Sequence, residues 1–198
     1  LTKFLYLKIK NKNINDDFFN YIKDFKFSRN YFKHNPPIWF DIFKKNSLLN
    51  KSVNVLEIGT FEGMSFLFFN KYLKIENLFC VDLIENKNFK VNREKFKNFK
   101  FFNTTSNKFF NENIEIKFDI IYVDGSHAVI DVFNDLSNSH KYLKENGILI
   151  IDDFLYDIDF RRNKSYHDEV MGGVFMFLKE NNKYKFLYTG HQLILKKN

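Results

Sequence analysis

The chain has 198 residues, 44% of them hydrophobic and 28% charged, which predicts one globular domain with a hydrophobic core. No uninterrupted apolar run is long enough to cross a bilayer. The single cysteine, Cys80, excludes a disulfide framework and a thiolate metal site, and it suits the reducing cytoplasm.

The net charge of +7 raises the question of nucleic acid, but the lysines are dispersed among phenylalanines and asparagines. Residues with A/T-rich codons are abundant, so base composition is the better explanation of the charge. The 27 phenylalanines are interpreted as core residues. Residues 1–8 lack a small-residue cleavage site, which predicts no signal peptide, and the leading Leu1 suggests that the natural start lies further upstream.

Residues 1–50 are predicted to form a helical flank or lid. Residues 1–14 are rich in lysine and asparagine, which is typical of a frayed arm or an edge strand. Apolar residues at helical spacing predict a helix over 16–26. The pair Pro36-Pro37 suits a first helical turn, so a second helix is expected from there to about Lys45.

From residue 53 the chain alternates strands and helices, which predicts a parallel sheet with right-handed crossovers. The expected strands are 53–58, 78–82, 100–103, 118–124 and 148–152, and the expected helices are 63–73, 88–98, 107–111 and 128–144. Residues 145–147 are expected to be a turn. After a polar loop over 155–167 and a helix over 169–180, strands 184–188 and 192–196 are close enough to form an antiparallel hairpin.

The stretch from Glu57 to Ser65 is expected to carry a binding turn, because a buried strand ends in two glycines four residues apart. Gly59 allows a tight turn, and Gly63 allows the next helix to approach the strand and a ligand. Phe61 occupies the place of a further glycine, which disfavours a pyrophosphate loop and favours a nucleoside without phosphates. An ordinary strand–turn–helix corner is the alternative.

Aspartates end three of the predicted strands, at Asp82, at Asp124 and at the pair Asp152-Asp153. Ligands of open α/β sheets bind outside the carboxyl ends of the strands, so these side chains are expected to converge. Asp82 is placed to accept hydrogen bonds from ribose hydroxyls. The other three carboxylates suit Mg²⁺ or another divalent cation. Helix capping is the alternative for Asp82, and loop capping is the alternative for one or two of the other aspartates.

The sequence Asp124-Gly125-Ser126-His127 is the most specific local indication of catalytic residues. An imidazole three residues after a metal ligand can take a proton from a substrate hydroxyl. His127 is therefore a candidate general base, and Asp124 is its candidate catalytic partner. A capping or packing role is the alternative. The other histidines, including His140 and His191, lack comparable surroundings.

Three motifs taken together, at 57–65, 122–127 and 147–154, resemble the class I S-adenosylmethionine-dependent methyltransferases. The most similar branch contains the small enzymes with an LEIGTFEG, VDGSH and IDD pattern, such as metal-dependent sugar and catechol O-methyltransferases. The resemblance implies an α/β, Rossmann-like, seven-stranded and mostly parallel sheet with helices on both faces and a C-terminal antiparallel hairpin. It implies that 51–198 is the methyltransferase domain.

The resemblance also implies roles for the motif residues. The residues expected to bind the cofactor are Glu57, Gly59, Thr60, Gly63, Asp82, Thr105 and Ser106. Asp124, Asp152 and Asp153 match the metal ligands of the metal-dependent relatives, and His127 matches the base of the sugar-modifying enzymes. Asp153 stands where the catechol enzymes carry Asn, which favours the sugar-type branch.

The expected function is O-methyl transfer from S-adenosylmethionine to a hydroxyl of a small molecule or a saccharide. Residues 154–168 would form the substrate wall, and Arg161, Arg162, Tyr166 and His167 would favour an acidic or phosphorylated acceptor. A solvated, mobile loop is the alternative for these residues. A nucleic-acid methyltransferase and a non-catalytic binding domain stay open as alternatives. The sequence argues against a nucleic-acid or membrane partner, favours the cytoplasm and leaves a homo-oligomer open.

Overall fold

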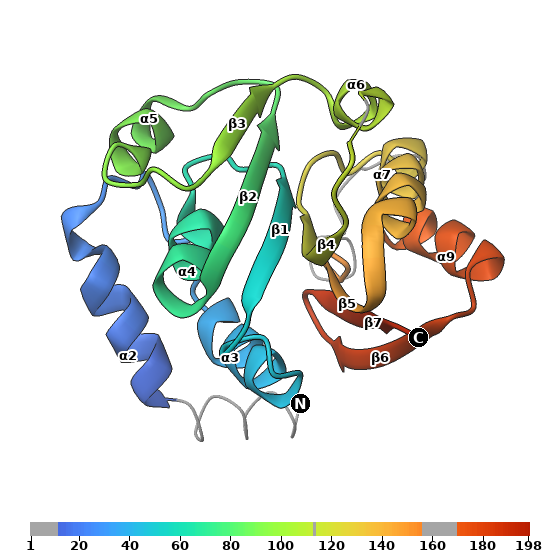
Figure 1. Cartoon of the computed structure of the whole chain (residues 1–198), viewed down its shortest axis with the longest axis horizontal. Helices are drawn as coiled ribbons and strands as arrows, with labels where there is room; N and C mark the ends of the chain where they lie inside the picture. Colours follow the sequence, from blue (N-terminus) through green and yellow to red (C-terminus); the bar gives the residue numbers. More distant parts are fainter. Residues whose placement is uncertain (1–11, 113, 156–169) are drawn as a thin grey trace.

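The centre of the molecule is a seven-stranded sheet in the order β3-β2-β1-β4-β5-β7-β6 (Figure 1). The computed structural model describes residues 12–112, 114–155 and 170–198. The strands are β1 Ser52–Ile58, β2 Lys74–Asp82, β3 Lys100–Asn103, β4 Phe118–Val123, β5 Leu143–Ile151, β6 Tyr184–Thr189 and β7 Leu193–Lys197. Strands β1 to β5 pair in parallel, whereas β7 is antiparallel to both β5 and β6. The predicted Rossmann-like fold with a C-terminal hairpin is confirmed.

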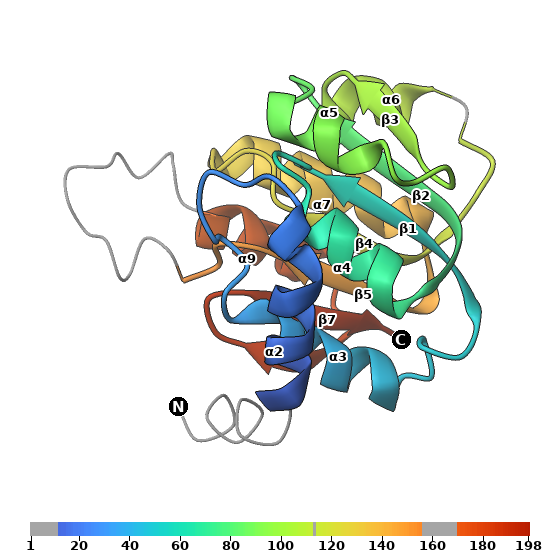
Figure 2. The ribbon, with the colours of Figure 1, turned by 90° about the vertical axis from the view of Figure 1, so that its left-hand side faces the viewer.

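Helices cover both faces of the sheet (Figures 1 and 2). The described helices are α2 Lys12–Tyr21, the 3-10 turn η1 Ile22–Asp24, α3 Asn35–Lys45, α4 Met64–Tyr72, α5 Lys87–Arg93, α6 Ser106–Asn111, α7 Val129–Tyr142 and α9 Val170–Glu180. The first five pack on one face, and α6, α7 and α9 pack on the other. Within the described ranges no helix could cross a membrane; even α7 has only 14 residues.

The strand side chains alternate between the two faces, which explains why the strands are apolar throughout. Val55 of β1 belongs to the core beneath α3 and α4, whereas Leu56 belongs to the core beneath α7 and α9. Helix α3 is part of the first core, because its Trp39 is fully buried and stacks on Phe69 with 5.2 Å between ring centroids. The N-terminal flank therefore shares one hydrophobic core with the sheet.

Several predicted boundaries differ from those in the structure. Strand β2 begins at Lys74 rather than at residue 78, and β5 begins at Leu143, so that the expected turn at 145–147 lies inside this strand. The first described helix starts at Lys12 and gives way to a 3-10 turn at Ile22. Most of the predicted arm at 1–14 and of the loop at 155–167, with Arg161, Arg162, Tyr166 and His167, lies outside the described residues.

Candidate active site

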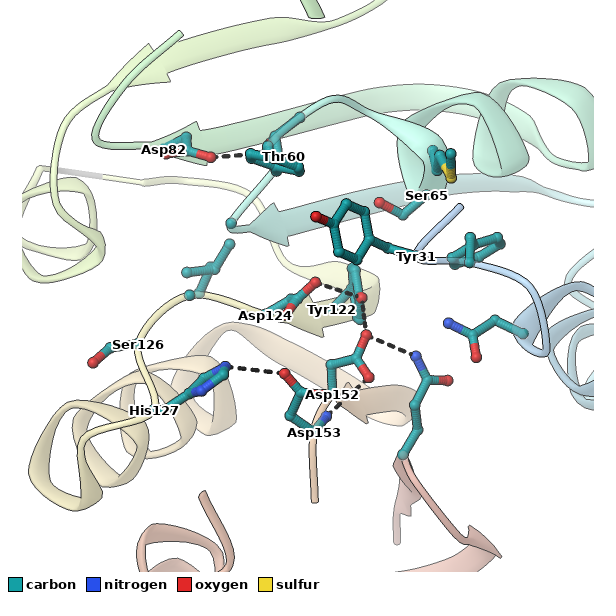
Figure 3. A pocket seen from close by; sticks show the side chains of 18 of the residues that line it. Tyr31, Thr60, Ser65, Asp82, Tyr122, Asp124, Ser126, His127, Asp152 and Asp153 are labelled. Carbon is teal, nitrogen blue, oxygen red and sulfur yellow. Dashed lines mark hydrogen bonds and ion pairs between the residues drawn. The ribbon is translucent and has the colours of Figure 1, made fainter. Parts of the chain in front are cut away.

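A cavity of about 1530 Å³ opens at the carboxyl ends of the parallel strands. Ten of the eleven predicted site residues line it. They come from the last residue of β2 and from the segments that follow β1, β3, β4 and β5: Gly59, Thr60, Gly63, Asp82, Thr105, Ser106, Asp124, His127, Asp152 and Asp153. The expected convergence of the strand ends on one cavity is therefore present in the structure (Figure 3).

The turn after β1 is built around its two glycines. Gly59 has φ +86°, and a Cβ there would lie 1.9 Å from the carbonyl oxygen of Asp124. Gly63 has φ +82°, and a Cβ there would lie 2.6 Å from the ring of Phe89. Between them Phe61 adopts φ +48°, and its N–H donates to Asp82 Oδ2 over 2.8 Å. The turn is thus packed too closely for side chains at either glycine.

Glu57 is the predicted cofactor residue that does not line the cavity. Its side chain is fully buried and accepts hydrogen bonds from the Ser65 hydroxyl and, over 3.6 Å, from the Cys80 thiol. Burial raises the pKa of Glu57 to about 8. Glu57 therefore lies beneath the cavity and supports the turn and the start of α4 rather than facing a ligand.

One end of the cavity carries the polar groups that suit a nucleoside. Both carboxylate oxygens of Asp82 already accept a backbone N–H, from Phe61 and from Ile84, which fixes the carboxylate at the end of β2. Thr105 caps α6 by accepting the N–H of Lys108 over 3.1 Å. The neighbouring Asp135, on α7, is buried, and this burial raises its pKa to about 6.

The other end of the cavity is acidic. The Tyr122 hydroxyl donates to Asp124 Oδ2 over 2.8 Å and also contacts Asp152 Oδ2 (Figure 3). Burial, followed by the negative charge of Asp152, raises the pKa of Asp124 well above its ordinary value. The phenol therefore stands between two of the three carboxylates that were predicted to share one cation.

Within the part of the chain that the structure describes, two clusters of potential metal ligands meet at Asp153. The first contains Asp124, His127 and Asp153, and the second contains Asp152, Asp153 and His191, with the ligand atoms of each cluster within 4.8 Å of one another. His127 Nε2 lies 3.0 Å from Asp153 Oδ2. Asp153 has φ +53°, a left-handed conformation that few non-glycine residues adopt, and its N–H donates to Asp152 Oδ1 over 2.9 Å.

Sequence reasoning missed the side chains that reach the cavity from distant segments. Gln192, in the turn between β6 and β7, donates to Asp152 Oδ2 over 3.0 Å, and His191 lies beside Asp153. Tyr31, from the segment before α3, points into the cavity (Figure 3) and meets Phe61 edge to face at 5.7 Å. Tyr122 was also missed, but it is a local residue: it lies two positions before Asp124 on the same strand face and could have been found from strand periodicity.

The sheet order, the glycine turn after β1 and the acidic strand ends together define a class I S-adenosylmethionine-dependent methyltransferase domain. Residues 56–154, half of the chain, match the family model described as Methyltransferase domain (Methyltransf_24). The chain therefore belongs to this methyltransferase family.

The chain is also similar to individual proteins. An uncharacterized protein of Acanthamoeba polyphaga mimivirus is 29% identical over 149 residues, which cover 68% of this chain and 65% of that protein. The MycE methyltransferase of the mycinamycin pathway, solved with Mg, S-adenosylhomocysteine (SAH) and mycinamycin VI, aligns with a TM-score of 0.65 at 17% identity, over 94% of this chain and 54% of MycE.

The N-methyltransferase NodS of Bradyrhizobium japonicum aligns with a TM-score of 0.54 at 13% identity, over 82% of this chain and 98% of NodS. The present chain therefore spans about two thirds of the mimiviral relative and about half of MycE. At these identities the structural likenesses establish the fold, and the acceptor has to be argued from the site itself.

Proposed function

We propose that this domain transfers the methyl group of S-adenosylmethionine to a hydroxyl oxygen of a small-molecule or saccharide acceptor. One observation carries the proposal: a single cavity joins a polar end around Asp82 to an acid–imidazole end around Asp124 and His127. Methyl transfer to oxygen needs both a donor site and a place for one proton, and the cavity offers both. The shared fold with MycE supports this assignment.

At the donor end, Asp82 would accept hydrogen bonds from the ribose hydroxyls, because its fixed carboxylate faces the cavity at the end of β2. Gly59 and Gly63 would keep the turn packed against Asp124 and Phe89, and the turn in this position borders the cavity beside the start of α4. Thr60 would line the methionine side, and Thr105 with Ser106 would contact the adenine. When bound, S-adenosylmethionine supplies a methyl group already activated by the sulfonium.

At the acceptor end, Asp124, Asp152 and Asp153 would hold a divalent cation, Mg²⁺ or another. The donor set fits, because carboxylate oxygens are hard ligands, the Tyr122 hydroxyl contacts both Asp124 and Asp152, and Asp153 shares one ligand cluster with each of these two. Carboxylates in such contact require a counter-charge or a proton. A bound cation would lower the pKa of an acceptor hydroxyl that it contacts. Tyr122 would then release one of the two carboxylates that its hydroxyl now contacts.

His127 would accept the proton of the acceptor hydroxyl. Asp153 faces Nε2 of the ring at 3.0 Å and favours the tautomer with the proton on this nitrogen, which leaves Nδ1 as the basic atom. His127 would take the hydroxyl proton as the acceptor oxygen gains the methyl group, and the transfer would leave SAH as the second product. Proton transfer by a positioned side chain contributes about 10²–10⁴-fold to such reactions.

The test follows the tritiated methyl group of S-adenosylmethionine into three acceptor pools: hydroxyl-bearing small molecules and saccharides, nucleic acid, and protein. We expect label in the first pool, a loss of label when EDTA removes divalent cations, and a reduction of about 10²–10⁴-fold in His127→Ala. SAH affinity, measured by isothermal titration, should be nearly unchanged in this variant.

Each alternative gives a distinct result. Label in nucleic acid would replace the proposed acceptor class. SAH binding without transfer to any pool would indicate a non-catalytic domain, and transfer that is insensitive to EDTA would remove the cation from the proposal. Full activity of His127→Ala would remove the assigned base.

A further inference from the structure

The antiparallel pairing of β5 with β7 determines which residues of the C-terminal hairpin reach the carboxylates of Asp124, Asp152 and Asp153, here called the acid cluster. In this register Ile150 pairs with Ile194, and Ile151 pairs with Leu193. Continuing the same register brings Gln192 opposite Asp152, and His191 opposite Asp153. Gln192 donates to Asp152 Oδ2 over 3.0 Å, and His191 Nδ1 lies 3.5 Å from Asp153 Oδ1. The turn between β6 and β7 therefore borders the acid cluster.

The two imidazoles occupy opposite sides of Asp153. His127 faces Oδ2 of this carboxylate at 3.0 Å, whereas His191 faces Oδ1 at 3.5 Å. His191 Nδ1 also lies 3.8 Å from Asp152 Oδ1. Since Tyr122 and Gln192 contact the other oxygen of Asp152, its Oδ1 is the atom directed toward His191.

These spacings are compatible with a single ion. Two ligand atoms bound to one octahedral cation at about 2.1 Å are about 3.0 Å apart when adjacent and about 4.2 Å apart when opposite. His191 Nδ1 lies 3.8 Å from Asp152 Oδ1 and 3.5 Å from Asp153 Oδ1, and the ligand atoms of all three residues lie within 4.8 Å of one another, so side-chain shifts of less than about 1 Å are sufficient. All three residues line the cavity, which gives the ion and a substrate hydroxyl access to the same place.

We infer that His191 is a further ligand of the divalent cation and that the site takes an ion that accepts imidazole, such as Mn²⁺, in preference to Mg²⁺. The chemical reason is that Mg²⁺ selects oxygen donors, whereas a nitrogen ligand favours first-row transition ions. The inference rests on the cation site of the proposed function and assigns different tasks to the two histidines: His191 binds the ion, and His127 takes the proton.

The test titrates the full chain with MnCl₂ and with MgCl₂ by calorimetry and records the pulsed electron paramagnetic resonance spectrum of bound Mn²⁺. We expect a directly bound nitrogen in the spectrum of the wild type. His191→Ala should lose this nitrogen signal and at least about tenfold in Mn²⁺ affinity, because the loss of a residue that only supports a ligand already costs about 10–100-fold. His191→Asp should recover Mn²⁺ binding without the nitrogen signal and should narrow the preference for Mn²⁺ over Mg²⁺.

Two matched variants complete the experiment. His127→Ala should keep the nitrogen signal. His140→Gln, at a histidine that contacts Tyr184 outside the cavity, should match the wild type in every measurement. A wild type that binds neither ion would overturn the cation site of the proposed function itself. A wild type that binds Mn²⁺ with the same affinity and spectrum as His191→Ala would overturn only the assignment of His191, and loss of the nitrogen signal in His127→Ala would transfer the ligand role to His127.

Discussion

The indole N–H of Trp39 donates to the side-chain oxygen of Gln192 over 2.7 Å, although the two residues are 153 positions apart. Both side chains are buried. The amide nitrogen of Gln192 in turn donates to Asp152 over 3.0 Å. The N-terminal flank therefore helps to position the acid cluster, through one helix residue and one residue of the hairpin turn.

This link predicts graded effects at Trp39. Trp39→Phe leaves the buried Gln192 oxygen without its donor, which should cost about 1–3 kcal/mol of unfolding free energy. Trp39→Ala also empties a fully buried site and should cost about 3–5 kcal/mol. Urea denaturation followed by circular dichroism measures both. Lys44→Ala, at an exposed position of the same helix, should change stability by less than about 0.5 kcal/mol. If Trp39→Phe were as stable as the wild type, the hydrogen bond would contribute nothing to folding.

The glycine turn gives a second prediction. Gly59→Ala should lower the unfolding free energy by at least about 3 kcal/mol, because its Cβ would overlap the backbone of Asp124 and because φ is +86°. Gly172→Ala is the matched control: it lies inside α9, and its Cβ would lie 3.1 Å from a Val129 methyl group. There the helix propensity of alanine opposes the mild contact, so the change should stay within about 1 kcal/mol. Equal effects of the two substitutions in denaturant titrations would contradict this account of the turn.

Local pattern was sufficient for the elements that are buried on both faces. Strand β4 was predicted almost to the residue, since Phe118–Val123 is an apolar run between polar turns. Strand starts were predicted less well. The first residues of β2 are mostly polar and at least partly exposed, and they form a strand because Lys74 and Ile75 pair with the start of β1. Such pairing is a long-range property that a window of sequence does not contain.

The same distinction between local and long-range properties decides which site residues could be predicted. Asp82, Asp124 and Asp152 could be predicted because their position at the end of a strand is a local property, and all three line the cavity. His191 could not be predicted as a site residue, because its approach to Asp153 depends on the register between β5 and β7. The orientation of Glu57 was available from strand periodicity, since it shares a face with Val55, but its position in the family motif suggested a ligand.

Asp82 carries the third prediction, on donor binding. Asp82→Ala should lower SAH affinity by about 10–100-fold, because hydrogen bonds from a ligand to a charged group contribute about 1.5–3 kcal/mol. Asp82→Asn keeps one acceptor oxygen and should lie between the alanine variant and the wild type. Glu76→Gln removes the same charge at the exposed start of the same strand and should bind SAH normally. Isothermal titration measures the SAH affinity of each variant. An unchanged affinity of Asp82→Ala would show that the ribose lies elsewhere.

The buried carboxyl of Glu57 predicts how stability depends on pH. Burial raises its pKa from the ordinary 4.5 to about 8, so between these values the folded protein keeps a proton that the unfolded chain releases. The contribution of Glu57 to stability is therefore fully present below about pH 4.5 and is lost as the pH rises toward 8. Within this window the unfolding free energy should fall by up to about 1.4 kcal/mol for each pH unit.

Glu57→Gln isolates this contribution, because the amide is a neutral isostere of the protonated acid and can still accept the hydroxyl of Ser65. Urea denaturation from pH 5 to pH 8 should show the variant gaining stability relative to the wild type as the pH rises. Glu112→Gln, at an exposed position, should follow the wild type throughout. A difference between Glu57→Gln and the wild type that does not vary with pH would mean that Glu57 is ionised in the fold, and the carboxylate would then have to be stabilised by the glycine turn that it supports.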